Sequence, residues 1–101
     1  MLKGVLDGMV LSIISRGETY GYEIANKLND MGFDGLAKAT VYALLSRLER
    51  NNLVSVTKKP SEKGPPRKIY TLNDRGVEEL TSFWIKWDFL NERLQMLRDN
   101  R

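Results

Sequence analysis

The sequence LVSVTKKPSEKGPPRKIYTL occupies residues 53–72 and contains two runs of strand-forming residues on either side of a loop. The runs at 53–57 and 67–72 are rich in β-branched and aromatic residues, which favour β-strands. The residues between them include Lys-Lys-Pro, a glycine and Pro-Pro, which favour a loop. The stretch therefore predicts a β-hairpin with a long, cationic tip.

Upstream of the hairpin, apolar residues recur at helical spacing in three segments. They predict helices over residues 2–15, 20–31 and 38–51. Gly17 is expected to end the first helix in a left-handed conformation, and Thr19 to cap the second. Ala37 precedes the third helix and has no side-chain cap to offer, which costs about 1 kcal/mol. The buried stripe of the third helix is expected to consist of Val41, Leu44, Leu45 and Leu48.

Downstream of the hairpin, Asn73 is a suitable cap for a last helix over residues 74–98. Apolar residues follow one another at steps of 3, 4, 3, 4 and 3, which is a heptad pattern. This heptad seam consists of Leu80, Phe83, Trp87, Leu90, Leu94 and Leu97. A helix of this size is about 37 Å long at 1.5 Å per residue, longer than the small body that precedes it. We expect the seam, together with Leu2 and Val5 of the first helix, to form a homodimer interface.

The order of helices, strand, loop and strand predicts the fold class. The chain is expected to be mainly α with a small β-hairpin, an α+β winged helix-turn-helix with a long C-terminal dimerisation helix. Residues 1–73 would form the DNA-binding domain and residues 74–101 the dimerisation helix. A chain of 101 residues has room for one compact body of this kind.

The composition excludes most enzymatic chemistry. The chain has no cysteine and no histidine, which excludes disulfides, thiolate metal sites and histidine general bases. It has no phosphate-binding Gly-Lys-Ser/Thr loop, and its adjacent Glu78 and Glu79 would not face each other on a helix. We therefore expect no enzyme activity, cofactor or metal. No stretch approaches the roughly 20 apolar residues of a membrane span, and no signal peptide is visible, so the expected location is the cytoplasm.

Positive charge is concentrated in the middle of the chain. Residues 38–72 contain eight basic and two acidic residues, a net charge of +6, whereas the flanking segments carry −2 and −1. A localised basic stripe is typical of a surface that binds a polyanion. A solvated face with a lysine-rich loop explains the charge alone equally well.

Several short motifs resemble those of the PadR family of bacterial transcriptional regulators, in order and over nearly the whole chain. They are LKG at 2–4, YGYEI at 20–24, TVY at 40–42, GP at 64–65 and RKIYTL at 67–72, with Gly76. The single C-terminal helix resembles the smaller PadR subfamily. The resemblance implies a homodimeric winged-helix repressor that binds double-stranded operator DNA. In parts of the family it also implies release by small aromatic or amphipathic compounds.

The candidate DNA-binding residues lie at the start of the third helix, in the hairpin and at the start of the second helix. Lys38 sits in the first turn of a helix, where it opposes the helix dipole, and a DNA phosphate would compensate for this. Small or hydroxyl side chains in the first turns suit base edges and phosphates. The full set is Tyr20, Lys38, Ala39, Thr40, Tyr42, Lys63, Gly64, Arg67 and Lys68. Some alternatives remain open. The lysines can simply be solvated, and Tyr42 can be partly buried. Arg47 and Arg50 can bind DNA or have a structural role.

Phe83, Trp84 and Trp87 form an aromatic cluster on the last helix. Such a cluster suits a dimer core and also a platform for a planar effector, and the two roles are compatible. Two other functions fit the same sequence. One is a winged-helix adaptor that binds protein, and the other is a dimeric small-molecule-binding protein without DNA binding. The salt dependence of binding to duplex DNA separates them.

Overall fold

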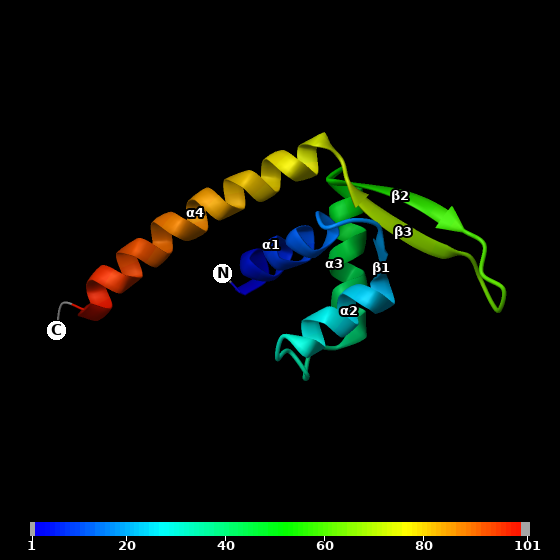
Figure 1. Cartoon of the computed structure of the whole chain (residues 1–101), viewed down its shortest axis with the longest axis horizontal. Coiled ribbons are helices and arrows are strands. Elements are labelled where there is room, and N and C mark those ends of the chain that lie inside the picture. The colour runs from blue at the N-terminus through cyan, green and yellow to red at the C-terminus, as the bar shows by residue number, and fades with distance from the viewer. Residues whose placement is uncertain (1, 100–101) are drawn as a thin grey trace.

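The computed structural model describes residues 2–99, with side chains from residue 4 onward. Four helices and a small antiparallel sheet, which lies on one side of them, make up the molecule (Figure 1), and this confirms the predicted α+β winged helix-turn-helix. In chain order, the elements are α1 (Leu2–Ile14), β1 (Thr19–Tyr20), α2 (Gly21–Asp30), α3 (Lys38–Arg50), β2 (Val54–Lys59), β3 (Arg67–Leu72) and α4 (Asp74–Asp99).

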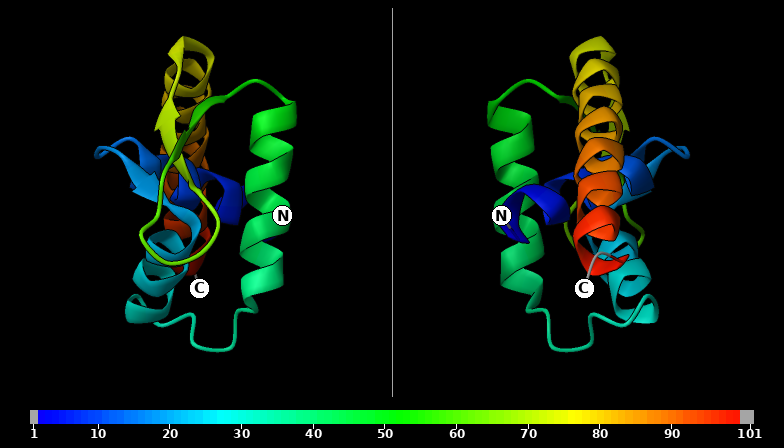
Figure 2. Two further views of the ribbon diagram at one scale, coloured as in Figure 1. Left: turned by 90° about the vertical axis from the view of Figure 1, so that its right-hand side faces the viewer. Right: turned by 90° about the vertical axis from the view of Figure 1, so that its left-hand side faces the viewer.

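The core lies where α1, α2 and α3 meet. Val10 and Ile14 of α1 pack with Ile24 and Leu28 of α2 and are almost completely buried. The predicted stripe of α3 is confirmed, because Val41, Leu44, Leu45 and Leu48 are all buried. The two views of Figure 2 show α2 and α3 lying beside each other, joined by a loop at one end. Burial on one face of α3 leaves its opposite face free for a partner.

The sheet has one more strand than the sequence predicted. β3 is central, β2 pairs with it from Val54↔Leu72 to Lys59↔Arg67, and β1 pairs through Thr19↔Tyr70 and Tyr20↔Ile69. Thr19 therefore belongs to a strand, and the prediction that it caps α2 is wrong. Tyr20 is the N-cap residue of α2 and makes no side-chain capping hydrogen bond. The Thr19 hydroxyl instead donates to Glu23 Oε1 at 2.6 Å.

The hairpin is also longer than predicted. Lys58 and Lys59, assigned to the loop by sequence, continue β2 and pair with Lys68 and Arg67. The strand stops before Pro60, which has no amide hydrogen for the ladder. We call β2, β3 and the connecting residues 60–66 the wing. At the end of α1, Gly17 has a φ of 137°, which confirms the expected left-handed conformation.

α4 begins as predicted and then leaves the body. Asn73 Oδ1 accepts a hydrogen bond from the Gly76 amide at 2.8 Å, which confirms the N-cap. Figure 1 shows α4 running past α1 and away from the side that carries the wing, and the molecule is 58 Å long but 20 Å thick. No helix in the described part of the chain combines the length and apolar character that a membrane span requires.

Candidate nucleic-acid interface

The first turn of α3 is presented to solvent. Lys38, Ala39 and Thr40 are all exposed, and Val41 turns into the core behind them. Ala37 precedes the helix in an extended conformation and makes no side-chain cap, as the sequence predicted. The Lys38 ammonium lies 4.8 Å from the centre of the Tyr22 ring in α2, a cation–π contact. This contact holds the positive charge of Lys38 at the N-terminus of α3, where the helix dipole disfavours a cation.

Tyr42 follows one turn later and rests on α2. Its side chain is 46% exposed, so it is not a core residue. A β-carbon at Gly21 would collide with the Tyr42 ring, so the glycine allows α2 and α3 to approach closely at this point. The exposed part of Tyr42 is available to a ligand.

The wing carries five of the eight basic residues found between positions 38 and 72. Lys63, Gly64 and Arg67 are exposed, and Gly64 has a φ of 106°, which favours glycine in this turn. The Ser61 hydroxyl donates to the Lys63 carbonyl at 3.2 Å and braces the same turn. Among the described residues, Lys63 takes part in none of the ion pairs, so its charge is available to an anion.

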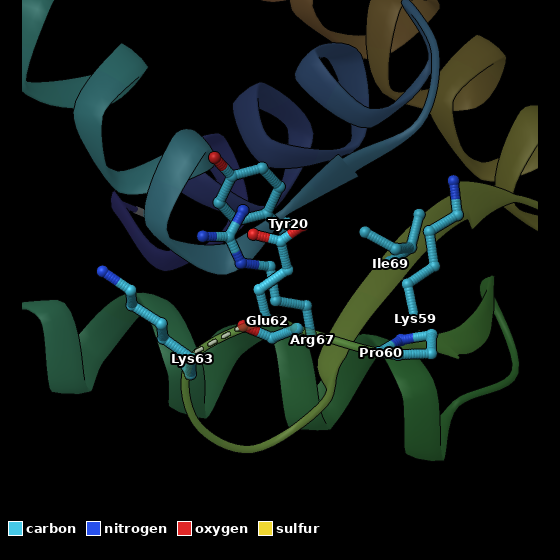
Figure 3. Close-up of a pocket in the computed structure, with 8 residues that line it drawn as sticks. Tyr20, Lys59, Pro60, Glu62, Lys63, Arg67 and Ile69 are labelled. Carbon is cyan, nitrogen blue, oxygen red and sulfur yellow. Dashed lines mark hydrogen bonds between the residues drawn. The ribbon is translucent and has the colours of Figure 1, made fainter.

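Arg67 lies at the junction of the wing and β1. Its guanidinium carbon is 4.5 Å from the centre of the Tyr20 ring, and Figure 3 shows the two side chains against each other. They border a cavity of about 470 Å³ beneath the wing loop, which Lys59, Lys63 and Glu62 also line. Three basic side chains against the one carboxylate of Glu62 give the lining of this cavity a net positive charge.

Two other wing cations are held by carboxylates. Lys68 lies 3.5 Å from Glu49 of α3, and Lys59 lies 3.2 Å from Glu18, which precedes β1. Each of these side chains is more than two-fifths exposed, so the pairs add little to stability. The Lys68–Glu49 pair nevertheless joins the wing to α3, and it lowers the net positive charge that Lys68 offers.

Four of the predicted residues, Tyr20, Tyr42, Arg67 and Lys68, thus meet where α2, α3 and the wing come together, and Lys38 reaches the same place through Tyr22. A second cavity of about 460 Å³ lies between these elements. Sequence reasoning missed Ser46 and Tyr70 in its wall, which carries Tyr20, Gly21, Tyr22, Tyr42, Ser46, Pro65, Pro66, Arg67, Lys68 and Tyr70. Ser46 lies on α3 and Tyr70 on β3. The sequence shows no sign that they share a cavity, because this depends on how the two elements pack against each other. The pKa of Tyr70 is raised, chiefly by burial and then by the charges of Glu49 and Tyr42.

The aromatic cluster of α4 is divided between two other cavities. Phe83 and Trp87 line an apolar groove of about 530 Å³ between α1 and α4, with Val5, Gly8, Leu11, Leu90 and Leu94. Trp84 instead borders a cavity of about 460 Å³ with Met9, Ile13 and Met31. The Phe83 ring contacts the Trp84 ring edge to face, with the ring centres 5.2 Å apart. The structure therefore does not bring Trp84 and Trp87 into one site within the chain.

Some of the residues predicted to form the dimer interface pack within their own chain, and others are exposed. Leu80 packs partly against the core of its own chain, and the Phe83 ring lies against Gly8. Leu90, Leu94 and Leu97 are exposed on the part of α4 that extends from the body. Val5 is half-buried beside the groove, and the Leu2 side chain lies outside the described residues. An apolar surface therefore remains on α4 and in the α1/α4 groove.

Comparison with known proteins gives this fold a family. The model of the transcriptional regulator PadR-like family matches residues 10–82. A Streptococcus transcriptional regulator of known structure is 40% identical over 97% of this chain and 96% of its own, with a TM-score of 0.88. A PadR-like transcriptional regulator from Bacillus cereus is 41% identical over 98% of this chain and 96% of its own, with a TM-score of 0.86.

A third solved structure is that of Bacillus subtilis PadR in complex with operator DNA. It is 25% identical over 80% of this chain, with a TM-score of 0.73, and the match covers 47% of that longer chain. The match of the family model over most of the chain and the two similar structures at 40% and 41% identity agree. They confirm the resemblance on which the sequence analysis relied: this chain belongs to the PadR-like family of transcriptional regulators.

Proposed function

We propose that this protein is a homodimeric repressor that binds double-stranded operator DNA and is released from it by a small effector. The observation that carries the proposal is the single face on which the start of α3 and the wing present exposed cations. A relative with the same winged fold, Bacillus subtilis PadR, has been solved with operator DNA. Binding to operator DNA would place the protein in the cytoplasm.

In this arrangement α3 would enter the major groove with its first turn. The small Ala39 permits close approach, and the Thr40 hydroxyl and methyl groups suit base edges and a thymine methyl. Lys38 and the Tyr42 hydroxyl would contact phosphates on either side. Lys63 and Arg67 of the wing would reach the backbone or the adjacent minor groove. Phosphate contacts would supply affinity, and the α3 contacts would supply sequence preference.

Dimerisation would use the free apolar surface of α4. Leu90, Leu94 and Leu97 continue the heptad seam beyond the body and are exposed in the single chain. A two-fold interface places the same surface on both partners, so the seam would meet its own copy and the α1/α4 groove of the partner. Two recognition helices related in this way would read an inverted repeat, with half-sites about one helical turn, roughly 34 Å, apart.

Release would follow from a ligand that favours another arrangement of the two α4 helices in the dimer. Phe83 and Trp87 in the α1/α4 groove offer aromatic surface for a planar or amphipathic compound. Its affinity must differ between the DNA-bound and released geometries, because otherwise no equilibrium shifts. A tenfold loss of operator affinity needs a difference of only about 1.4 kcal/mol.

Titration of duplex binding against salt concentration tests the DNA-binding part. If each protomer neutralises about three phosphates, the plot of log affinity against log salt has a slope of about −5. Lys63→Ala should weaken binding to all sequences, whereas Thr40→Ala should reduce the preference among them. Lys27→Ala is the matched control, because this exposed lysine lies beside Trp84, away from the wing. A slope near zero would favour the protein-binding adaptor instead.

A further inference from the structure

Three consecutive residues at the start of α2 each contact a different part of the proposed DNA-binding surface. Tyr20 holds Arg67 of the wing over its ring at 4.5 Å, and Tyr22 holds Lys38 of α3 at 4.8 Å. Gly21, between them, receives the Tyr42 ring. We call residues 20–22 the hub. The wing and the recognition helix are separate in sequence, and both rest on this one tripeptide.

The hub holds its partners through ring faces and close packing. A cation–π contact uses the face of an aromatic ring and does not require the tyrosine hydroxyl. It also leaves the N–H groups of the cation available as hydrogen-bond donors. Arginine and lysine lose much rotamer freedom when they bind an anion, so a cation that is already held loses less. Contacts of this kind preorganise charge on the surface.

The position of the hub in the fold reinforces this effect. Tyr20 is part of β1 and is paired with Ile69, and Gly21 is buried, so the backbone of the tripeptide is fixed by the sheet and the core. Arg67 and Lys38, by contrast, are both exposed. The sheet and the core therefore fix the tripeptide, and the tripeptide holds two exposed cations at a separation that its short length limits.

We propose that Tyr20 and Tyr22 are positioning residues for DNA binding. They act through Arg67 and Lys38, which they hold at a fixed separation, ready for phosphates on one stretch of duplex. Gly21 completes the hub. Because it has no side chain, the Tyr42 ring can pack against its backbone, between Tyr20 and Tyr22 in the sequence. The proposal rests on the proposed function, and it gives Tyr20 a role different from the phosphate contact that the sequence predicted. The ring is the active part, and the hydroxyl is dispensable.

Paired substitutions at Tyr20 separate these two roles. The probe is a mixed-sequence duplex of about three helical turns, with binding followed by fluorescence anisotropy at low salt. Tyr20→Phe keeps the ring and should bind DNA like the wild type. Tyr20→Leu removes the ring and should weaken binding about two- to fivefold. Equal losses in both variants would assign the effect to the hydroxyl and overturn the proposal.

A double-mutant cycle distinguishes positioning from a general loss of structure. In an Arg67→Ala background, Tyr20→Leu should have no further effect on DNA affinity, because the cation that it positions is gone. The same holds for Tyr22→Leu in a Lys38→Ala background. The crossed pairs, Tyr20 with Lys38 and Tyr22 with Arg67, should be additive. Structural damage would persist in every background, so full additivity within both pairs overturns the proposal.

The same measurements distinguish a failure of the proposed DNA binding from a failure of the positioning role. Wild-type protein that fails to bind the duplex overturns the proposed DNA binding, and the positioning role with it. Wild-type protein that binds, with a cycle that shows no coupling within the pairs, overturns the positioning role alone. Thermal unfolding of Tyr20→Phe and Tyr20→Leu beside the wild type verifies that each measurement is made on folded protein.

Discussion

Arg47 Nη2 of α3 donates a hydrogen bond to Asp7 Oδ1 of α1 across 40 positions of sequence. The two side chains are 24% and 29% exposed, so the pair is largely removed from water. Asp7 also lines the α1/α4 groove. The pair therefore joins the helix beside the proposed effector groove to the proposed recognition helix. It gives Arg47 a structural role, one of the two that the sequence left open.

Arg47→Ala should lower the free energy of unfolding by about 1 kcal/mol, because it removes a charge-assisted hydrogen bond and leaves the Asp7 carboxylate half-buried. Urea unfolding measures the change. Arg50→Ala is the matched control, since Arg50 is exposed at the end of the same helix, and it should change stability by less than about 0.5 kcal/mol. Equal effects of the two substitutions would show that the Asp7 pair does not stabilise the fold.

The fold was largely predictable because its long elements have strong local signals. The spacing of apolar residues located every helix within a few residues, and Asn73 marked the start of α4. β1 was missed because a two-residue strand has no periodicity and exists only through its pairing with β3. Thr19 is both a common cap and a β-branched residue, and the tertiary pairing decided between these roles.

The site was predictable by residue type but not by contact. Charge and helix position singled out Lys38 and Arg67, yet nothing local links them to Tyr22 and Tyr20. Lys68 was predicted as a DNA-binding residue, and its pairing with Glu49 depends on how β3 lies against α3. Such contacts join elements distant in sequence, so composition and periodicity carry no trace of them.

Substitutions of two glycines in α1 should act in opposite directions. Gly8→Ala should lower the free energy of unfolding by about 1 to 2 kcal/mol, because the new methyl group collides with the Phe83 ring that packs α4 on α1. Gly4→Ala meets nothing within 4 Å and should raise it by about 0.5 to 1 kcal/mol through helix propensity. Denaturant unfolding tests both. A stabilising Gly8→Ala would mean that Phe83 moves aside freely.

Tyr70 should make the protein less stable in alkali. Burial raises the pKa of Tyr70 above its usual value of 10.0, and the charges of Glu49 and Tyr42 act in the same direction. Above pH 10 the unfolded chain therefore loses this proton before the folded chain does, so stability falls as pH rises. Tyr70→Phe has no proton to lose at this position and should show a shallower decline as the pH rises above about 9. Parallel curves for the two proteins in urea unfolding would contradict this.

The heptad seam should control oligomeric state. Leu94→Glu places a charge in the proposed interface and should convert dimers to monomers, as measured by light scattering. Met96→Glu is the matched control, because Met96 is 57% exposed where Leu94 is 56% exposed, and two residues along a helix place it on another face. Dimers that persist in Leu94→Glu would exclude the seam as the interface.

The two tryptophans should respond differently to an effector. Trp87 lines the α1/α4 groove, whereas Trp84 borders the cavity beside Met9 and Met31. A planar aromatic compound that binds in the groove should quench Trp87 by direct contact. The Trp84→Phe protein should therefore keep the quenching and its concentration dependence, and the Trp87→Phe protein should lose most of both.

The same compounds should weaken DNA binding in the Trp84→Phe protein and lose this effect in the Trp87→Phe protein. The coupling is reciprocal, so operator DNA should lower the affinity for the compound by the same factor. Planar aromatic acids and hydrophobic cations serve as probes, because the groove is apolar and Asp7, Glu79 and Lys86 line it. Quenching that is lost in Trp84→Phe and kept in Trp87→Phe would place the effector between α1, α2 and α4. Release would then act directly on the body formed by α1 and α2, without a change in the angle between the two α4 helices of the dimer.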